Sequence, residues 1–373
     1  MMIQIKEAKT KAEMKAFVTF PFELFKNSPN WIPPLISDEL NTFNRAENPA
    51  FKTSDVQFLL AYKDGKLVGK TAAIVNWDEV NVLKKNKTRF GWFDVIDDID
   101  VTKALLDAVI AFGKEKGMDH IEGPMGFSNL DKVGALTEGF DKMGNMITWY
   151  SMPYYKEHFL KLGLQIEKTY IEGDFSFSNI DPTPYRRASQ LIKKRFKLRS
   201  TSFKKTSEVM PYVDKMFDLF NSSYAKLQSF VPINEEQKAY FKKKYISFIN
   251  PEYIKFVLDE NDKMVAFSIL MPGFAQALKK ANGKLFPFGF YHMLQAKKHS
   301  KEVVFYLIGV LPEYQKKGVT AIIFDEAHAI CEAKGITKCV RTPELEENEA
   351  VHNLWKNFDA KVTKKRSTFI KHI

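Results

Sequence analysis

The order of the predicted elements constrains the fold of this chain more than any other feature, because the same order occurs twice. Alternating apolar residues predict strands, and apolar residues three to four positions apart predict helices. Each half then contains a hairpin, a strand, a helix, a strand, a short helix and a closing strand. These elements span residues 56–75, 89–97, 101–117, 118–125, 153–164 and 166–177 in the first half, and 253–271, 302–311, 320–335, 336–343, 348–358 and 361–373 in the second.

This repeat predicts an α/β fold of two tandem domains, each with a mixed central sheet flanked by helices. The chain has 373 residues, which is more than one typical domain and suits two. Asn, Asp and Pro cluster in "SFSNIDPTPY" (176–185), as is typical of a linker. We therefore expect one domain at residues 1–175 and another at residues 176–373.

The composition of the chain indicates which cellular compartment and which classes of ligand to expect. Cys331 and Cys339 are the only cysteines, so no disulfide framework is expected and a reducing compartment fits. The N-terminus lacks a secretory apolar core, and no run approaches the roughly 18 apolar residues of a spanning helix. We expect a cytoplasmic protein, with peripheral contact at the inner membrane face left open. The 32 Phe residues suggest either thick aromatic cores or a site for apolar ligands.

The net charge points to anionic partners. It is +11, from 56 Lys and Arg against 45 Asp and Glu, and the most basic run lies at residues 185–205. This run is either a solvated helix face or an electrostatic contact for acidic membrane lipid or a carrier protein. No nucleic-acid-binding signature accompanies it, so a nucleic-acid partner is not expected.

One strand-to-helix turn predicts a phosphate site. In "VLPEYQKKGVTAIIFDEA" (310–327) a strand ends and an amphipathic helix begins, which exposes unpaired backbone N–H groups at the positive end of the helix dipole. Gly318 permits close approach of a ligand to the backbone, and Lys316 and Lys317 add positive charge at the rim. A pyrophosphate group fits such a turn.

The same stretch, from Val310 to Thr320, resembles the acyl-CoA-binding motif of the GNAT superfamily of N-acetyltransferases. In that family a V-x-P-x-Y strand end precedes Q/R-x-x-G-x-G/A at a helix N-terminus. The resemblance implies acetyl-CoA or a longer acyl-CoA as cosubstrate. Thr320 departs from the family's Gly or Ala, and its β-branch crowds the backbone. The cofactor-binding residues expected here and downstream are Ile308, Val310, Gln315, Lys316, Lys317, Gly318, Val319, Thr320, Asn348 and Trp355.

Downstream, "NEAVHNLWKNFDA" (348–360) resembles a second GNAT element, N-x-x-A-x-x-L-Y-x-x-x-G-F. Asn348 matches the family's Asn, which the resemblance places near the cofactor. Trp355 stands at the Tyr that many members use as general acid, and an indole cannot serve as an acid at neutral pH. If this half is catalytic, another group or water must protonate the leaving thiolate.

The first half resembles a narrower group, the bacterial tandem-GNAT acyltransferases, which includes bacterial ceramide synthases. The resemblance rests on "WIPP" (31–34), "IEGPMGFSNLDKVGALTEGFD" (121–141) and "PYY" (153–155). It implies an amine acceptor, either a small molecule or a lipid of the sphingoid-base kind. The counterpart of the phosphate turn, "DVIDDID" (94–100), carries four Asp that would repel a pyrophosphate, so CoA binding is not expected in this half.

The catalytic candidates lie mainly in the loop after the strand at 118–125. A neutral amine must attack the thioester, so a base has to be within reach. Glu122, Glu138 and Asp141 are alternatives for the base, and a backbone N–H near Ile308 to Val310 is expected to stabilise the oxyanion. The candidates taken forward are Glu122, Ser128, Asn129 and Tyr155.

Two further classes remain to be weighed. The H-x-x-C spacing of His328 and Cys331 lacks a second ligand pair, so no metal site is expected. A non-catalytic module on a degenerate GNAT fold, holding a lipid or a protein, is the alternative to an enzyme.

Overall fold

Strands and helices alternate along the chain in the order that the sequence predicts for both halves. The computed structural model describes residues 2–128, 130–225, 230–246, 249–356 and 358–373. The strands are β1 (Ile3–Glu7), β2 (Ser54–Lys63), β3 (Lys66–Asn76), β4 (Lys87–Val95), β5 (His120–Gly123), β6 (Ala135–Glu138), β7 (Gln165–Ser176), β8 (Arg199–Ser200), β9 (Ile254–Leu258), β10 (Met264–Pro272), β11 (Glu302–Val310), β12 (Lys338–Leu345) and β13 (Lys361–His372).

The helices lie between these strands. They are α1 (Lys11–Leu24), α2 (Ile36–Thr42), α3 (Trp77–Leu83), α4 (Ile99–Glu115), α5 (Tyr154–Lys161), α6 (Thr183–Phe196), α7 (Thr206–Val209), α8 (Val213–Tyr224), α9 (Glu235–Phe241), α10 (Ala275–Ala281), α11 (Gly289–His299), α12 (Thr320–Ala333) and α13 (Glu349–Trp355). In the described residues, no helix combines the length and the apolar character that crossing a bilayer requires.

The two halves share one continuous sheet. Among the described residues it has 13 strands, in the order β1-β2-β3-β4-β5-β13-β7-β12-β11-β10-β9-β8, with β6 paired to β13. Most neighbours are antiparallel, and the pairs β4–β5 and β11–β12 are parallel. The predicted mixed α/β architecture is therefore confirmed, and the sheet runs through the predicted boundary at residues 175 and 176.

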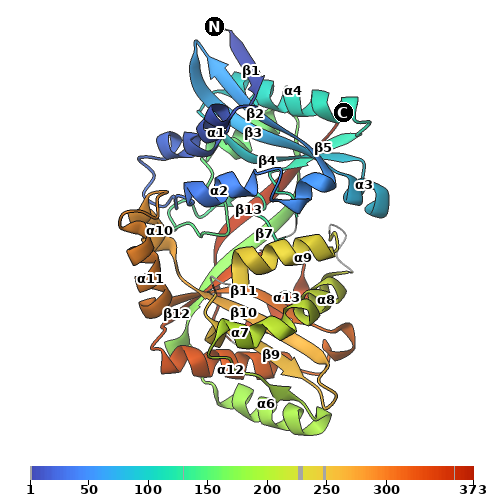
Figure 1. Ribbon diagram of the computed structural model, residues 1–373, viewed down its shortest axis with the longest axis vertical. Coiled ribbons are helices and arrows are strands. Elements are labelled where there is room, and N and C mark those ends of the chain that lie inside the picture. The colour runs from blue at the N-terminus through green and yellow to red at the C-terminus, as the bar shows by residue number, and fades with distance from the viewer. Residues whose placement is uncertain (1, 129, 226–229, 247–248, 357) are drawn as a thin grey trace.

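The closing strand of each half lies against the other half. Strand β7 ends the first half and pairs with β12 of the second, whereas β13 ends the chain and pairs with β5 of the first. The two strands also pair with each other, in a register that runs from Lys361 opposite Asp174 to Ile370 opposite Gln165. Figure 1 shows them crossing the middle of the molecule between its upper and lower parts.

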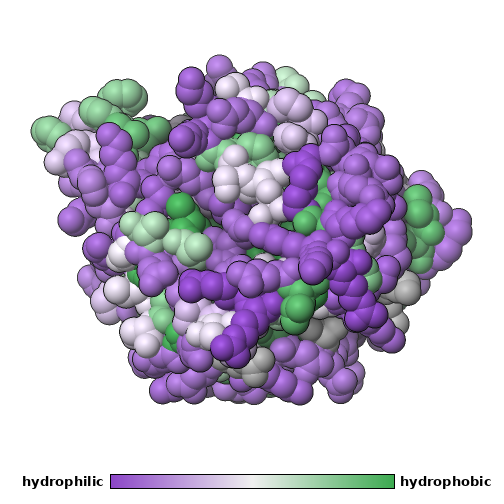
Figure 2. Space-filling view, turned by 90° about the horizontal axis from the view of Figure 1, so that it is seen from below, coloured by the Kyte–Doolittle hydropathy of each residue, from purple (hydrophilic) through white to green (hydrophobic). Residues whose placement is uncertain are grey.

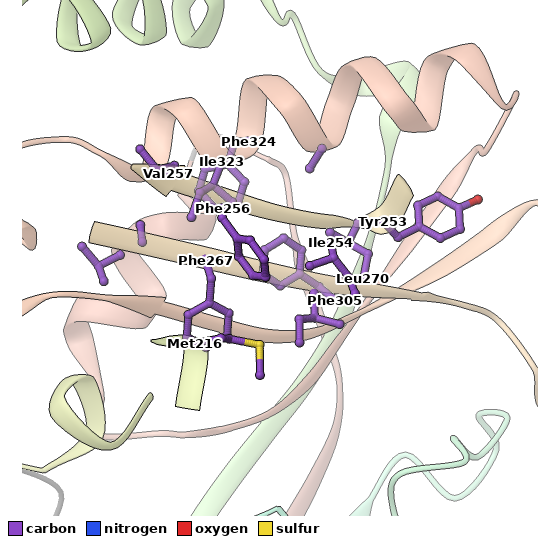
Figure 3. Close-up of a cluster of buried hydrophobic side chains, with 14 of the residues drawn as sticks. Met216, Tyr253, Ile254, Phe256, Val257, Phe267, Leu270, Phe305, Ile323 and Phe324 are labelled. Carbon is purple, nitrogen blue, oxygen red and sulfur yellow. The ribbon is translucent and has the colours of Figure 1, made fainter. Parts of the chain in front are cut away.

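The core of the second half lies on both faces of its sheet. Strands β9 and β10 are buried along their whole length, as their nearly continuous apolar sequences IKFVL and MVAFSILMP require. In Figure 3, Ile323 and Phe324 of α12 cover one face of these strands, and Met216 of α8 packs with Phe267 on the other.

Candidate active site

In the second half, the parallel strands β11 and β12 separate part of the way along. They pair from Glu302 opposite Lys338 to Phe305 opposite Arg341, and no pairing is described beyond. The register between β10 and β11 shifts at the same level, so Tyr306 has no opposite residue on β10. The separation opens one edge of β11.

Backbone groups on that edge of β11 face the opening. The N–H of Leu311 donates to Val265 O, so by the alternation of an antiparallel ladder Ile308 and Val310 direct their N–H and C=O groups away from β10. Their carbonyls accept hydrogen bonds of 2.9 Å from Tyr224 Oη and 3.0 Å from Ser223 Oγ. The N–H groups of Ile308 and Val310 have no acceptor among the described residues, so a ligand carbonyl can bind there.

The turn before α12 has the properties predicted for a phosphate site. Gly318 has φ +73°, a conformation that favours glycine. The helix has Val319 at its N-cap, with no side-chain cap. The N–H groups that have no acceptor among the described residues are those of Lys316, Gly318, Val319 and Thr320. Thr320 therefore does not cap the helix, and these donors remain available for an anion.

Side chains around the turn restrict how a ligand enters. A Cβ on Gly318 would lie 2.9 Å from Ile192 Cδ1, so α6 covers one side of the turn. The Lys317 ammonium lies 4.4 Å from the ring centroid of Tyr314 and 5.3 Å from that of Phe196. The amide of Gln315 donates to Val310 O, which ties the turn to the end of β11.

A cavity of about 240 Å³ lies where β11 and β12 separate, between the two halves of the chain. Five of the predicted site residues line it, namely Glu122, Ser128, Ile308, Asn348 and Trp355. The aliphatic and aromatic part of the wall includes Met125, Leu130, Phe220, Phe230 and Val351. The polar part adds carboxylates and phenols that the sequence did not single out, namely Asp131, Tyr170, Tyr224, Tyr306 and Glu344.

Glu344 on β12 is the cavity carboxylate whose environment favours proton uptake. Burial raises its pKa above the ordinary value, although hydrogen bonds from Arg341 and Trp355 oppose the shift. Trp355 Nε1 donates to Glu344 Oε1 at 2.8 Å, and Arg341 also forms an ion pair with this carboxylate. Trp355 is 4 % exposed and packs against Phe305 and Phe324. Trp355 thus orients a carboxylate rather than transferring a proton itself.

Glu122 on β5 faces the cavity from the first half. Its Oε2 lies 2.7 Å from Lys87 Nζ, and Lys87 also pairs with Glu79 at 2.8 Å. Arg89 pairs with Glu79 and donates to Gly126 O at the start of the predicted active-site loop. Burial would raise the pKa of Glu79, but Arg89 and Lys87 lower it to about 2. The second oxygen of Glu122 has no hydrogen-bond partner among the described residues.

Three phenols complete the polar wall. Burial raises the pKa of Tyr224 to about 12 and also raises the pKa values of Tyr170 and Tyr306. All three phenols are therefore protonated at neutral pH and can donate hydrogen bonds.

The remaining catalytic candidates are placed differently. Ser128 forms a local turn, in which its N–H and its hydroxyl both donate to Asp131 Oδ2. Tyr155 is 1 % exposed and lies in the core of the first half, so it is not part of the cavity wall. Asn129 lies outside the described residues. Glu138 and Asp141 are exposed and pair with Lys365 and Lys142.

The first half reproduces the open edge of the second half and then closes it. Val95 of β4 lies opposite Gly69 as Val310 lies opposite Ala266, and both strands leave the sheet with matching hydrogen bonds, Ile96 N to Val68 O and Leu311 N to Val265 O. Both backbone groups of Val95 are however hydrogen-bonded within the chain. Its N–H donates to Tyr155 Oη at 3.1 Å, and its C=O accepts from Tyr154 Oη at 2.7 Å. No group of Val95 is left for a ligand.

The helix N-terminus of the first half is also satisfied from within. Asp98 caps α4 by accepting from the N–H groups of Asp100 and Val101, at 3.0 and 3.4 Å. The Lys63 ammonium pairs with the same carboxylate at 2.5 Å. A carboxylate therefore takes the place at α4 that is open at α12.

In the described part of the chain, no group of three or more His, Cys, Asp and Glu side chains is arranged to hold a metal ion. Cys331 and Cys339 are both buried and free, and burial raises the pKa of the Cys331 thiol to about 12.

Comparison with known sequences gives distant relatives. No protein-family model matches the chain. Protein YghO of Escherichia coli (strain K12) is 28% identical over 316 residues, which cover 84% of this chain and 80% of that protein. A bacterial ceramide synthase of Caulobacter vibrioides is 24% identical over 323 residues, which cover 82% of this chain and 80% of that protein. The second relative is named as a member of the group that the first-half motifs resemble.

Comparison with solved structures confirms the predicted fold. A tandem GNAT protein from the clavulanic acid biosynthesis pathway, solved without AcCoA, matches with a TM-score of 0.59 and 7% identity, over 100% of this chain and 98% of that chain. A probable N-acyltransferase of Enterococcus faecalis V583 matches with a TM-score of 0.52 and 10% identity, over 100% and 73% of the two chains. The chain therefore has the tandem GNAT fold.

Proposed function

We propose that this protein is an acyl-CoA-dependent N-acyltransferase with one cofactor site, in its second half. The observation that carries the proposal is the alignment of free backbone donors along β11 and the start of α12. The N–H groups of Ile308 and Val310 line the opened strand edge, and those of Gly318 and Val319 lie at the following helix N-terminus. A thioester arm followed by a pyrophosphate group matches that sequence of donors.

The reaction follows from the groups around the cavity. A neutral amine attacks the thioester carbonyl carbon, the C–N bond forms, and the oxyanion is stabilised by a β11 N–H. The C–S bond then breaks, and the CoA thiolate leaves. Glu344 takes the proton that the amine loses, because burial raises its pKa and so favours proton uptake. The thiolate takes its proton from water or from a cavity phenol.

The acceptor is an amine-bearing small molecule or lipid. Glu122 and Asp131 place two carboxylates on the first-half wall of the cavity, where they can bind an ammonium or a hydroxyl group. The apolar wall and the relative named as a bacterial ceramide synthase favour a long acyl chain and a lipid amine of the sphingoid-base kind.

The test is direct transfer with defined donors. The purified chain is titrated calorimetrically with acetyl-CoA and palmitoyl-CoA, and is then incubated with each donor and with sphinganine or a small primary amine. Thiol release and the mass of the amide product are measured together. We expect saturable binding of at least one donor, at one site per chain, and amide formation that requires the amine.

Other outcomes separate the competing function from this one. Binding of a donor without amide formation, with every amine tried, would favour a non-catalytic module that holds a lipid on the same fold. Absence of binding by either donor would overturn the cofactor site itself.

A further inference from the structure

We propose that the helical hairpin α10–α11 is a docking surface for anionic phospholipid bilayers. It interrupts the second half between β10 and β11, where the first half has only the short helix α3 between β3 and β4. In Figure 1 the two helices lie at the left edge of the molecule, beside the junction of the halves. The proposal goes beyond the transferase function and does not depend on it.

Large apolar side chains project from this hairpin into solvent. Phe286 and Phe288 in the connection are 76% and 71% exposed, and their neighbours on α11 continue the patch. The rings of Phe286 and Phe290 lie 5.7 Å apart. The exposed apolar residues of the hairpin are Phe286, Phe288, Phe290, Tyr291 and Leu294. Such a concentration of exposed large apolar side chains on one hairpin is unusual for a face that contacts only water.

The charged side chains of the hairpin itself are all of one sign. Between Asp262 and Glu302 the sequence contains no acidic residue. The lysines of the hairpin and its ends are Lys279, Lys280, Lys284, Lys297, Lys298 and Lys301. Lys280, Lys284 and Lys298 are exposed, and they form no ion pair with a carboxylate among the described residues. Aromatic residues beside unpaired lysines match the interface of an anionic bilayer, where rings enter the headgroup layer and ammonium groups meet phosphate.

The basic run at residues 185–205 is a weaker candidate for the same role. Figure 2 looks at the molecule from below, where α6 lies, and purple hydrophilic side chains cover most of that face. Four of the nine Lys and Arg of this run form ion pairs within the chain, namely Arg186–Asp325, Lys193–Glu326, Lys197–Glu260 and Arg199–Asp262. Leu191 is its one exposed large apolar side chain among the described residues. This face therefore lacks the aromatic groups that would enter a bilayer.

The inner side of the hairpin is held firmly. Leu278 of α10 and Met293 of α11 pack in a buried cluster with Ile32 and Leu35 of the first half. The Gly283 carbonyl accepts from Ile36 N at 3.0 Å, so the connection is tied to α2. The exposed aromatic residues thus stand on a rigid support, and binding to a bilayer would require little ordering of the chain.

The hairpin also joins the surface to the interior. Leu278 and Met293 line a second cavity of about 150 Å³, and the segment Leu130–Lys132, Ile147 and Tyr306 line both this cavity and the main one. An amphipathic molecule that leaves the bilayer at the hairpin would therefore meet the second cavity first. In this way a docking surface at α10–α11 would place the cavities next to the membrane.

Vesicle flotation tests the proposal without acyl-CoA. The full chain is mixed with vesicles of phosphatidylcholine alone, or of equal parts phosphatidylcholine and phosphatidylglycerol. We expect binding to the anionic vesicles, little binding to the neutral ones, and weaker binding as salt is raised. Two variants probe the surface, Phe286→Ser with Phe288→Ser, and Lys280→Glu with Lys284→Glu, and each should lower the affinity roughly tenfold or more.

The control variant changes the same charge elsewhere. Lys194→Glu with Arg195→Glu, on α6, alters the net charge by the same amount as the lysine pair and should keep vesicle affinity within about twofold. Loss of binding in this control, or full binding in the Phe286 and Phe288 variant, would overturn the proposal. A change of oligomeric state in the Phe286 and Phe288 variant, measured by sedimentation without vesicles, would also overturn the proposal. The patch would then be a contact between copies of the chain.

Discussion

Trp355 Nε1 donates a 2.8 Å hydrogen bond to Glu344 Oε1 on the wall of the main cavity. This donor stabilises the ionised form of the carboxylate, against a burial that raises its pKa. Replacing Trp355 by Phe keeps an aromatic ring and removes the donor. We therefore expect Trp355→Phe to raise the pKa of Glu344 further.

The pH profile of kcat/KM measures this shift. If Glu344 accepts the proton, the acidic limb of the profile moves to higher pH, because the base must be ionised in the free enzyme. The control is Phe358→Leu, which alters a ring 5.7 Å from Trp355 and contributes no hydrogen bond to Glu344. Movement of the alkaline limb alone would assign Glu344 as an acid instead.

Substitutions of the two cavity carboxylates, Glu344 and Glu122, are expected to change different kinetic parameters. Glu344→Gln removes the proton acceptor and should lower kcat roughly a hundredfold or more, with a small change in KM for the amine. Glu122→Gln weakens acceptor binding and should mainly raise that KM, by about tenfold. Both variants keep side-chain volume. Equal losses in kcat for the two variants would contradict this division of roles, and steady-state kinetics at several amine concentrations would reveal it.

The phosphate turn can be tested with two glycines at opposite ends of α12. Gly318 has φ +73° before the helix and Gly335 has φ +61° after it, so a side chain is strained at both, by about 1–2 kcal/mol. Gly318→Glu also places a carboxylate among the N–H donors, and we expect the Kd for acyl-CoA to rise tenfold or more. Gly335→Glu should leave that Kd nearly unchanged. Calorimetric titration of both variants with acyl-CoA measures the two Kd values. A similar Kd in the two variants would mean that the turn at Gly318 does not bind the cofactor.

Much of the fold follows from local patterns in the sequence. The strand and helix at β11 and α12 are predicted within a few residues of their observed bounds, since apolar periodicity is set by the residues of the element itself. The exchange of β7 and β13 is not predicted. Both are closing strands with ordinary alternation, and their partners are chosen by tertiary packing that no local pattern records.

The candidate site likewise contains residues that local sequence patterns predict and residues that they do not. The positive φ at Gly318 favours glycine, which the sequence shows, and Glu122 lies at the end of a strand, where ligands are expected. Glu344 and Tyr170 were missed, because each is an ordinary strand residue until β11 and β12 separate beside it. The exposure of the Phe residues of α10–α11 is not predicted, since composition does not distinguish a buried ring from an exposed one.

Substitution of Tyr155 can distinguish a structural role of this residue from the predicted catalytic role. Its hydroxyl accepts from Val95 N at 3.1 Å inside the first half. Tyr155→Phe would leave that buried N–H without a partner, and we expect the free energy of unfolding to fall by about 1–3 kcal/mol. Chemical denaturation measures this loss, and kcat/KM should change less than about twofold. A large fall in kcat with unchanged stability would instead support the catalytic prediction.

The ion pairs between β7 and β13, the closing strands of the two halves, should make the stability of the chain sensitive to acid. Arg366 of β13 and Lys364 both pair with Glu172 of β7, at 2.6 and 3.0 Å, and all three side chains are buried. Burial alone would raise the pKa of Glu172, but these two cations hold it below its ordinary value. The folded pKa is thus lower than the unfolded pKa. Stability from this group is fully present above the unfolded pKa, about 4.3, and is lost as pH falls through the folded pKa.

Glu172→Gln should therefore lower the free energy of unfolding by about 3–5 kcal/mol at pH 7, because it leaves two buried cations without their counter-ion. The variant should also lose part of the acid dependence below about pH 4.3, since the titrating group is gone. Urea denaturation at pH 7 and at acidic pH measures both effects. Glu138→Gln is the control, because this exposed carboxylate pairs with Lys365 of the same strand at 3.8 Å. An equal loss in the two variants would mean that the buried pairs do not hold the exchanged strands together.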